Sequence, residues 1–142
     1  MSRIAILALV TLLLGSNPAV ASQKADLFCL SHVVYHEARG ESFNGQLAVA
    51  YVVLNRSLAW HRSICQVVYQ PAQFTNIRKT IPVETSREWQ TAHFAATMAT
   101  KKYIDDPTKG SLYFYAPHKV SEPRWARMKK FVGRIGHHLF YK

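Results

Sequence analysis

The sequence predicts an α+β fold, a single domain with a helical core and a small antiparallel β-sheet. Before residue 105, apolar residues recur at helical spacing, and the run from Leu47 to Leu54 is almost continuously apolar. Turn-forming residues fill positions 105–110. After them, 112–115 and 132–141 are rich in aromatic and β-branched residues interrupted by glycines, which is typical of short strands.

The N-terminus has the pattern of a secretory signal peptide. Arg3 precedes an apolar run over 4–14, and an Ala-x-Ala site follows at 19–21. We expect residues 1–21 to be removed, leaving an exported mature chain over 22–142 in the periplasm or cell wall, or secreted. The apolar run is much shorter than the about 20 residues that a membrane span requires, so we expect no span after cleavage. An uncleaved anchor is the alternative.

The expected helices cover about 27–38, 44–57, 64–69 and 86–103. Asp26 precedes the first helix and Gly40 follows it, so we expect them to supply its N-cap and its C-terminal turn. The second helix is apolar almost throughout and should be the buried centre of the domain. Thr85 and Glu88 have the spacing of a capping box at the start of the last helix, whose apolar face extends to Tyr103.

The late aromatic residues have two interpretations. In a strand over 112–115, Phe114 would lie on one face and both Tyr113 and Tyr115 on the other. Aromatic rings beside hydroxyl groups suit the binding of sugar rings, but the same residues could complete the core of a small domain.

The charge of the mature chain favours an anionic partner. The 18 Lys and Arg residues outnumber eight Asp and Glu, and removal of Arg3 leaves a formal net charge of +9. For an exported protein, the candidate partners are an anionic cell-wall polymer, a membrane surface and extracellular nucleic acid, and the alternative is that the charge serves only solubility. No run of five or more basic residues occurs, so nucleic acid is not an expected partner. The length corresponds to one domain, and we expect a monomer.

Both cysteines, Cys29 and Cys65, lie in the mature chain, where export permits a disulfide between them. The bond would close a loop of about 35 residues and stabilise the fold by roughly 3 to 4 kcal/mol on the entropic model. It would also tie the first helix to the segment after Trp60. Two buried free thiols are the alternative, and the lack of a Cys-x-x-Cys motif disfavours a metal or redox role.

Glu37 is the main catalytic candidate. It lies among apolar neighbours in the last turn of its helix, where both burial and the helix dipole would raise the pKa of its carboxyl. A raised pKa is what a general acid for glycoside cleavage requires. The structural alternative is a buried ion pair with Arg39 or Arg56.

Other polar residues near Glu37 favour structural roles. Glu41 is separated from Glu37 by the turn at Gly40 and precedes the second helix, where it could accept free backbone N–H groups. His32 and His36 lie one helical turn apart, but Gly40 stands where a zincin needs its second histidine, so we expect no metal. The chain also lacks a Gly-x-Ser-x-Gly nucleophile elbow.

Several motifs occur in order at close spacing. They are YHEARGE at 35–41, GQLAVA at 45–50, VLNR at 53–56, CQVVYQ at 65–70, QF at 73–74, DPTKGSLYFYA at 106–116, PRW at 123–125 and RIGHHLFY at 134–141. Together they closely resemble the SleB-type cell-wall hydrolases, also called spore-cortex-lytic enzymes. The resemblance covers nearly all of the mature chain.

The resemblance implies a lysozyme-like, transglycosylase-type fold that cuts peptidoglycan between N-acetylmuramic acid and N-acetylglucosamine, without a cofactor. It implies that Glu37 is the catalytic acid, since this residue aligns with the first glutamate of the motif. Glu41 falls on the second glutamate, and Gln73, Phe74, Tyr113 and Tyr115 fall where cleft-lining residues are expected; these five are our candidates for substrate binding.

The scarcity of carboxylates near Glu37 favours a lytic transglycosylase, which needs one acid, over a hydrolytic N-acetylmuramidase, which needs two. Only Glu41 is close to Glu37 in sequence. A non-enzymatic, cationic cell-wall-binding protein is a further alternative, although an acid in an apolar setting gives a binding module no advantage. An exported nuclease is disfavoured because metal-binding acids are lacking.

Overall fold

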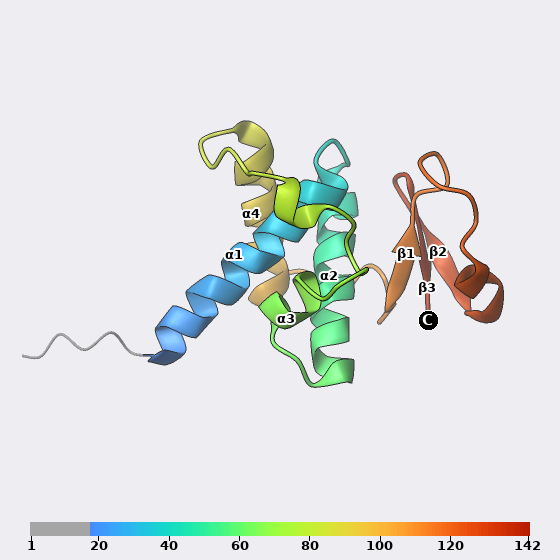
Figure 1. Cartoon of the computed structure of the whole chain (residues 1–142), viewed down its shortest axis with the longest axis horizontal. Helices are drawn as coiled ribbons and strands as arrows, with labels where there is room; N and C mark the ends of the chain where they lie inside the picture. The colour runs from blue at the N-terminus through green and yellow to red at the C-terminus, as the bar shows by residue number, and fades with distance from the viewer. Residues whose placement is uncertain (1–17) are drawn as a thin grey trace, which may run out of the picture.

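The computed structural model describes residues 18–142, so most of the expected signal segment lies outside the described residues. The elements are α1 (Pro18–Ala38), α2 (Phe43–Trp60), α3 (Ile64–Val68), η1 (Ile77–Lys79), α4 (Arg87–Thr100), β1 (Tyr113–Tyr115), η2 (Arg124–Met128), β2 (Phe131–Ile135) and β3 (His138–Tyr141). The α-helices gather on one side of the molecule and the strands on the other (Figure 1). This arrangement confirms the predicted α+β fold with a small sheet.

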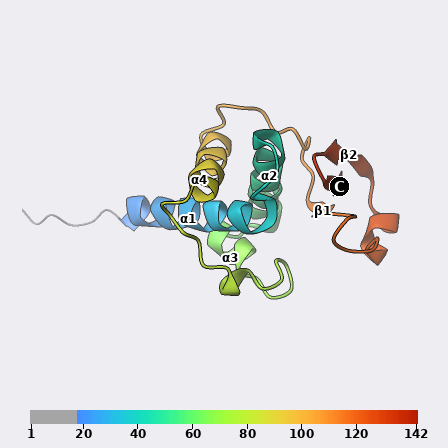
Figure 2. The ribbon, with the colours of Figure 1, turned by 90° about the horizontal axis from the view of Figure 1, so that it is seen from above.

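Helix α2 is the centre of the domain. It lies between the sheet and the other helices, and seen from above α1 runs across both α2 and α4 (Figure 2). Val49 and Val53 pack into the apolar core formed by the helices. Ala48 and Val52 instead contact Phe140 of the sheet. Because both sides of α2 are covered, its almost continuous apolar run is buried, as the sequence predicts.

The sheet has three antiparallel strands in the order β1-β3-β2. Phe114 of β1 lies opposite Phe140 of β3, and both rings belong to the contact between the sheet and α2. Tyr113 and Tyr115 contact Trp125 on the other face of the sheet. The predicted separation of Phe114 from the two tyrosines is therefore confirmed.

Two predicted helix ends are wrong. Helix α1 begins at Pro18 rather than near residue 27, because residues such as Ala25 and Lys24 favour the helical conformation and extend it. Asp26 therefore lies inside the helix and is not its N-cap. Helix α4 ends at Thr100, after which Lys102 has a left-handed backbone with φ of 54°. Tyr103 consequently leaves the helix face and is 71% exposed.

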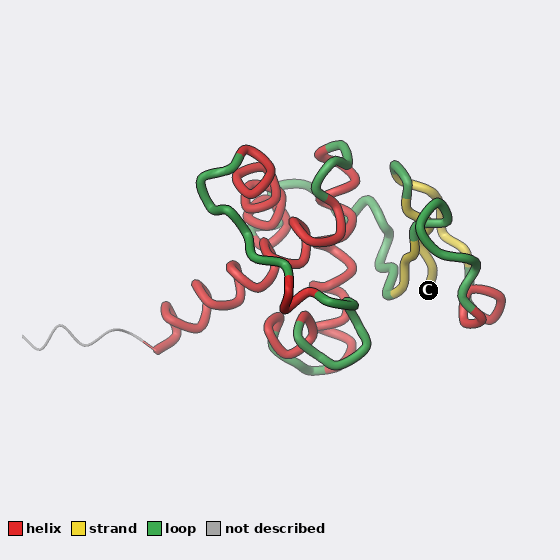
Figure 3. The backbone as a smooth tube through the Cα atoms, turned by 45° about the horizontal axis from the view of Figure 1, so that its top comes forward, coloured by secondary structure: helices red, strands yellow, loops and turns green. Residues whose placement is uncertain are grey.

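The segment between α3 and α4 is mostly loop, with only the short η1 within it (Figure 3). Phe74 and Ile77 bury their side chains in the helical core and so anchor this loop against the helices. Over residues 18–142, no helix combines the length and apolarity needed to cross a membrane.

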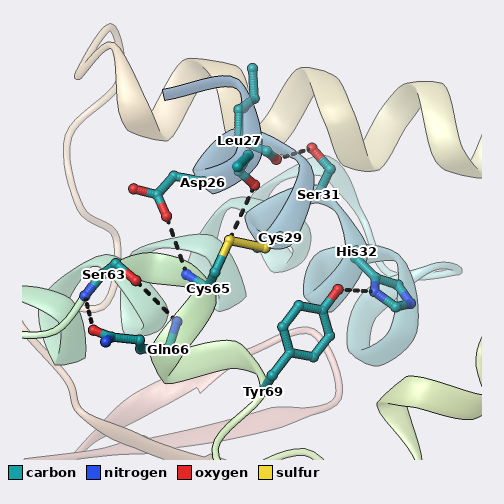
Figure 4. Close-up of a disulfide and its surroundings, with 10 residues drawn as sticks. Asp26, Leu27, Cys29, Ser31, His32, Ser63, Cys65, Gln66 and Tyr69 are labelled. Carbon is teal, nitrogen blue, oxygen red and sulfur yellow. Dashed lines mark hydrogen bonds between the residues drawn. A yellow bond between two sulfur atoms is a disulfide. The ribbon is translucent and has the colours of Figure 1, made fainter. Parts of the chain in front are cut away.

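A disulfide joins Cys29 of α1 to Cys65 of α3, with Cα atoms 5.2 Å apart, as predicted (Figure 4). The backbone N–H of Cys65 also donates to the Asp26 carboxylate at 3.2 Å. Ser63 and Gln66 form a capping box at the start of α3. The disulfide and the Asp26 hydrogen bond hold α3 against α1, the helix whose last turn carries Glu37.

Candidate active site

A cleft of about 260 Å³ opens beside the C-terminal turn of α1, between the helices and the sheet. It is lined by Glu37, Arg56, Gln73, Phe74, Thr75, Phe114, Tyr115, Ala116, Lys119, Val120 and His138. These residues come from α1, α2, the loop after α3, β1 with the turn that follows it, and β3. The fold therefore brings segments from the whole domain together around one carboxyl group.

The end of α1 places Glu37 in this cleft. Gly40 adopts φ of 104°, which a glycine tolerates and other residues avoid, and Glu41 N–H donates to Ala38 O at 2.9 Å to close the turn. The side chain of Glu37 is 24% exposed. Burial raises the pKa of its carboxyl above the ordinary value, while Lys119 and Arg56 partly oppose this shift. The sequence-based expectation that burial raises the pKa of Glu37 is therefore supported.

The alternative role of Glu37, a buried ion pair with Arg39 or Arg56, is not observed. Among the described residues, neither arginine lies within 4 Å of the Glu37 carboxylate. The guanidinium of Arg39 instead lies over the Tyr35 ring at 5.0 Å.

His36 lies beside the acid but is already engaged elsewhere. Its Nε2 is 3.4 Å from Glu37 Oε1 and donates to Thr75 O at 3.0 Å, while Nδ1 accepts from the Thr80 hydroxyl. Burial lowers the pKa of His36, so the ring is neutral at pH 7. His32 binds Tyr69 and Thr80 in a similar way. Both rings thus hold the loop against α1, and no group of three metal-binding side chains is positioned for a metal within residues 18–142.

Arg56 brings a buried cation to the cleft. It is 6% exposed, and its Nε donates to Leu112 O at 2.7 Å. Its guanidinium lies 5.4 Å from the Trp60 ring and 5.3 Å from the Phe74 ring, while Nη1 is buried with no hydrogen-bond partner in the described structure. Burial lowers the pKa of Arg56 to about 10, so it still carries its charge at neutral pH.

The opposite wall carries His138 and Lys119. His138 is 2% exposed and meets the Phe114 ring edge-on at 5.2 Å. Burial lowers the pKa of His138 to about 4, so this ring is neutral at pH 7. Lys119 is exposed, on a turn closed by its N–H donating to Ala116 O at 2.9 Å. At neutral pH the cations lining the cleft are therefore Arg56 and Lys119.

Glu41 is not among the residues that line this cleft, although its Oε1 lies 3.9 Å from Nδ1 of His138, which does line it. Ser42, not Glu41, caps α2 by accepting from Gly45 N–H at 3.3 Å. The Glu41 carboxylate instead accepts from the His137 backbone N–H at 3.2 Å and lies 2.8 Å from His137 Nδ1. Burial would raise the pKa of Glu41, but the hydrogen bonds from His137 outweigh it and lower this pKa. Glu41 thus ties the α1–α2 corner to the turn between β2 and β3.

The other predicted binding residues are divided between two hollows. Gln73, Phe74 and Tyr115 line the cleft with Glu37. Tyr113 lines an adjoining hollow that also includes Gln73, together with Trp60, Arg62 and Gln70. Because Gln73 borders both, the two hollows form neighbouring parts of one surface.

Seven of the eleven cleft residues were not identified as such from the sequence, and three of these seven carry a titratable side chain. Arg56 is a cation near the end of a largely apolar, buried helix. Because arginine is rarely buried without a partner, this position could have been recognised from the sequence as a candidate functional residue. His138 follows a glycine turn in a strand pattern and gives a weaker signal. Lys119 is one of many lysines, and no local pattern distinguishes it.

Sequence comparison relates this chain to cell-wall hydrolases. The sequence model of a family described as Cell Wall Hydrolase matches residues 40–141, so the match begins three residues after Glu37. The chain is 35% identical to the spore cortex-lytic enzyme of Bacillus subtilis over 121 residues, which cover 81% of this chain and 37% of that protein. The chain thus spans less than half the length of this curated relative.

Solved structures match over most of the chain. The catalytic domain of the germination-specific lytic transglycosylase SleB from Bacillus anthracis superposes with a TM-score of 0.70 and 31% identity, covering 82% of this chain and 93% of that domain. The catalytic domain of the Bacillus cereus SleB protein gives a TM-score of 0.69 and 30% identity, covering 84% and 91%. The fold described above is therefore that of these catalytic domains.

Proposed function

Because the chain belongs to the Cell Wall Hydrolase family, we propose that it cleaves the glycan strands of peptidoglycan between N-acetylmuramic acid and N-acetylglucosamine, as a lytic transglycosylase. One observation carries the proposal. Glu37 is a carboxylic acid with a raised pKa at the wall of an open cleft, and it is the only Asp or Glu among the described residues that line that cleft. The catalytic domains with a similar fold include one named as a lytic transglycosylase.

The chemistry requires one group that first gives and then takes a proton. Protonated Glu37 donates to the glycosidic oxygen as the bond between this oxygen and C1 of the muramic acid breaks. The 6-hydroxyl of the same sugar then attacks C1 and returns its proton to Glu37, which forms a 1,6-anhydro ring. Atoms balance without water, and Glu37 ends in its starting state.

The position of Glu41 supports this reaction over hydrolysis. A two-carboxylate glycosidase needs its second carboxylate aimed at the reacting sugar, at about 5 Å or about 6.5 to 9.5 Å from the acid. The Glu41 carboxylate is bonded to His137 and is absent from the cleft lining described for residues 18–142. Hydrolysis by an N-acetylmuramidase mechanism is the alternative, with a different product.

We further propose that the protein is exported through its N-terminal segment and acts as a monomer on peptidoglycan. Its net positive charge would favour contact with an anionic wall. A cationic protein that binds the wall without cleaving it remains a distinct alternative, and turbidity loss of purified sacculi separates the two.

The decisive experiment is mass spectrometry of sacculi digested with the wild type and with Glu37→Gln. The wild type should release fragments ending in anhydro-muramic acid, one water lighter than the products of hydrolysis. Glu37→Gln should release none while unfolding at an unchanged or higher temperature. Products with hydrated muramic acid ends would show that the enzyme is a muramidase and not a lytic transglycosylase. Cleavage by Glu37→Gln would refute the catalytic role of Glu37.

A further inference from the structure

We propose that a basic hollow beside the Glu37 cleft binds the peptide stems of peptidoglycan, with Arg62 and Arg78 pairing with the free carboxylates of the peptide. This inference rests on the proposed function, since the stems belong to the same polymer. It adds a second recognised group, because the protein would bind the acidic peptide attached to the strand as well as the sugar rings.

The hollow, called here the arginine hollow, has a volume of about 630 Å³ and is formed by α3, the residues on either side of it, and η1. Its lining includes Arg62, Gln66, Tyr69, Gln70 and Arg78. Arg62 and Gln70 also line the hollow that contains Tyr113, which shares Gln73 with the Glu37 cleft. The arginine hollow is therefore continuous with that cleft.

The step from the cleft to the arginine hollow is short. Gln73, which lines the cleft, donates its backbone N–H to Gln70 O at 3.3 Å. The side chain of Gln70 in turn accepts from Arg62 Nη1 at 2.9 Å. A group attached to a sugar in the cleft therefore has to pass only one turn of the loop to reach a guanidinium.

The arginine hollow is positively charged. Among the described residues, no Asp or Glu lines it, and no carboxylate lies within 4 Å of Arg62 or Arg78. Asp26 comes close, because it accepts from the Cys65 N–H, but it is not part of the lining. Arginine keeps its charge at neutral pH. The hollow therefore complements an anionic ligand, whatever the protonation state of Glu37.

Both guanidinium groups are held in place before any ligand binds. Arg62 is bonded to Gln70, while Arg78 Nη2 donates to Tyr69 O at 3.4 Å and its guanidinium lies 4.7 Å from the centre of the Tyr69 ring. Each arginine has five N–H donors, so donors remain for a ligand. Because side chains that are already ordered lose less conformational entropy on binding, these two arginines suit the recognition of carboxylates.

The stems of peptidoglycan have the matching chemistry. An amide bond joins each stem to the lactyl group of N-acetylmuramic acid, so the free carboxylates lie further along the peptide. They belong to the γ-linked glutamate and to the C-terminus of stems that are not cross-linked. Four extended residues reach at most about 13 to 14 Å. A strand bound at Glu37 would thus carry its negative charges out of the cleft and towards the neighbouring surface.

The test compares two soluble ligands that differ only in the charge of their peptides. Both are the tetrasaccharide of alternating N-acetylglucosamine and N-acetylmuramic acid with a tetrapeptide stem on each lactyl group. The peptide carboxylates are free in one ligand and are primary amides in the other. Binding is measured by calorimetry on Glu37→Gln, which prevents turnover. We expect the acid to bind about three- to tenfold more tightly than the amide, the range of two exposed ion pairs.

Variants of the two arginines assign the preference. Arg62→Gln combined with Arg78→Gln, in the Glu37→Gln background, should reduce the preference to less than about twofold and leave the affinity for the amide nearly unchanged. Arg87→Gln combined with Lys101→Gln is the matched control. It removes the same charge at the two ends of α4, where both side chains are exposed and line neither the cleft nor the two hollows, and it should leave the preference intact.

Equal affinities for the two ligands would overturn the inference, as would a failure of the acid to bind. A preference that survives the double arginine substitution, or that the control loses equally, would also overturn it. A glycerol phosphate oligomer that binds through both arginines, with equal affinities for the two glycopeptides, would assign the hollow to an anionic wall polymer instead. The proposed function fails separately, if wild-type protein releases no glycan fragments from sacculi, whereas the peptide preference is measured without turnover.

Discussion

Glu41 Oε1 lies 2.8 Å from Nδ1 of His137, a residue 96 positions later in the chain. The other carboxylate oxygen accepts the His137 backbone N–H at 3.2 Å. The β2–β3 turn is therefore fastened to the corner that follows Glu37. Since His138 comes directly after this contact and lines the cleft, Glu41 positions one wall of the candidate site without lining it.

Glu41→Gln should destabilise the fold in a pH-dependent way. Because the folded-state pKa of Glu41 is lowered, its stabilising contribution is present above the ordinary carboxyl pKa and is lost as the pH falls through the folded-state value. At pH 7 we expect the variant to lose about 1 to 2 kcal/mol in free energy of unfolding, the size of a charged hydrogen bond. Urea unfolding at neutral and acidic pH measures the difference, which should shrink in acid.

Glu122→Gln is the matched control. Its carboxylate pairs with Arg127 at 2.8 Å, but the side chains are 46% and 75% exposed respectively. Such an exposed ion pair contributes little to stability, so Glu122→Gln should lower the free energy of unfolding by less than about 1 kcal/mol. Equal destabilisation by Glu41→Gln at both pH values would contradict the assigned role of its charge.

Gly136→Ala should disrupt the same contact from the other side. A Cβ at Gly136 would lie 2.0 Å from Glu41 Oε2, and the backbone there has φ of 58°, which is unfavourable for alanine. We expect a loss of at least about 1 kcal/mol in free energy of unfolding, and a smaller loss when Glu41 is also changed to Ala. Gly133→Ala, which has open space around its Cβ and no left-handed φ, is the control.

Urea unfolding could show that Gly133→Ala and Gly136→Ala lower the free energy of unfolding by the same amount. The β2–β3 turn would then not lie close to Glu41. If the cost of Gly136→Ala is unchanged by Glu41→Ala, it arises from the backbone alone and not from displacement of the carboxylate.

Features that depend on residues close together in the sequence were predicted correctly. The apolar run in α2 identified the centre of the fold, and the alternation around Phe114 identified the two faces of β1. The proximity of Glu41 to helix α2 suggested capping, yet its carboxylate binds His137, because a contact across 96 positions leaves no periodic trace in the sequence. Lys119 was missed for the same reason, since the turn after β1 brings it to the cleft only in three dimensions.

Removal of the disulfide should lower stability without altering the cleft. Cys29 and Cys65 close a loop with a sequence separation of 36, so Cys29→Ser with Cys65→Ser should cost about 3 to 4 kcal/mol in free energy of unfolding. The bond joins α1 to α3 away from the cleft lining. Thermal unfolding with and without reductant measures the effect; the double serine variant should be insensitive to reductant. A wild type equally insensitive to reductant would argue against the bond.

Glu37→Gln should stabilise the fold above acidic pH. Because burial raises the folded-state pKa of Glu37, its contribution to stability is present below the ordinary carboxyl pKa and is lost as the pH rises through the folded-state value. Gln does not titrate and avoids this loss. Urea unfolding should therefore give nearly equal stabilities in acid and a more stable variant at higher pH.

Glu84→Gln, at an exposed position with no comparable burial, should show no such divergence from the wild type. A Glu37→Gln variant that is less stable than the wild type at every pH would mean that the carboxylate holds the fold together, as in the ion-pair alternative. A gain confined to higher pH would instead show that the fold keeps a buried acid at a cost in stability, which a purely structural residue would not require.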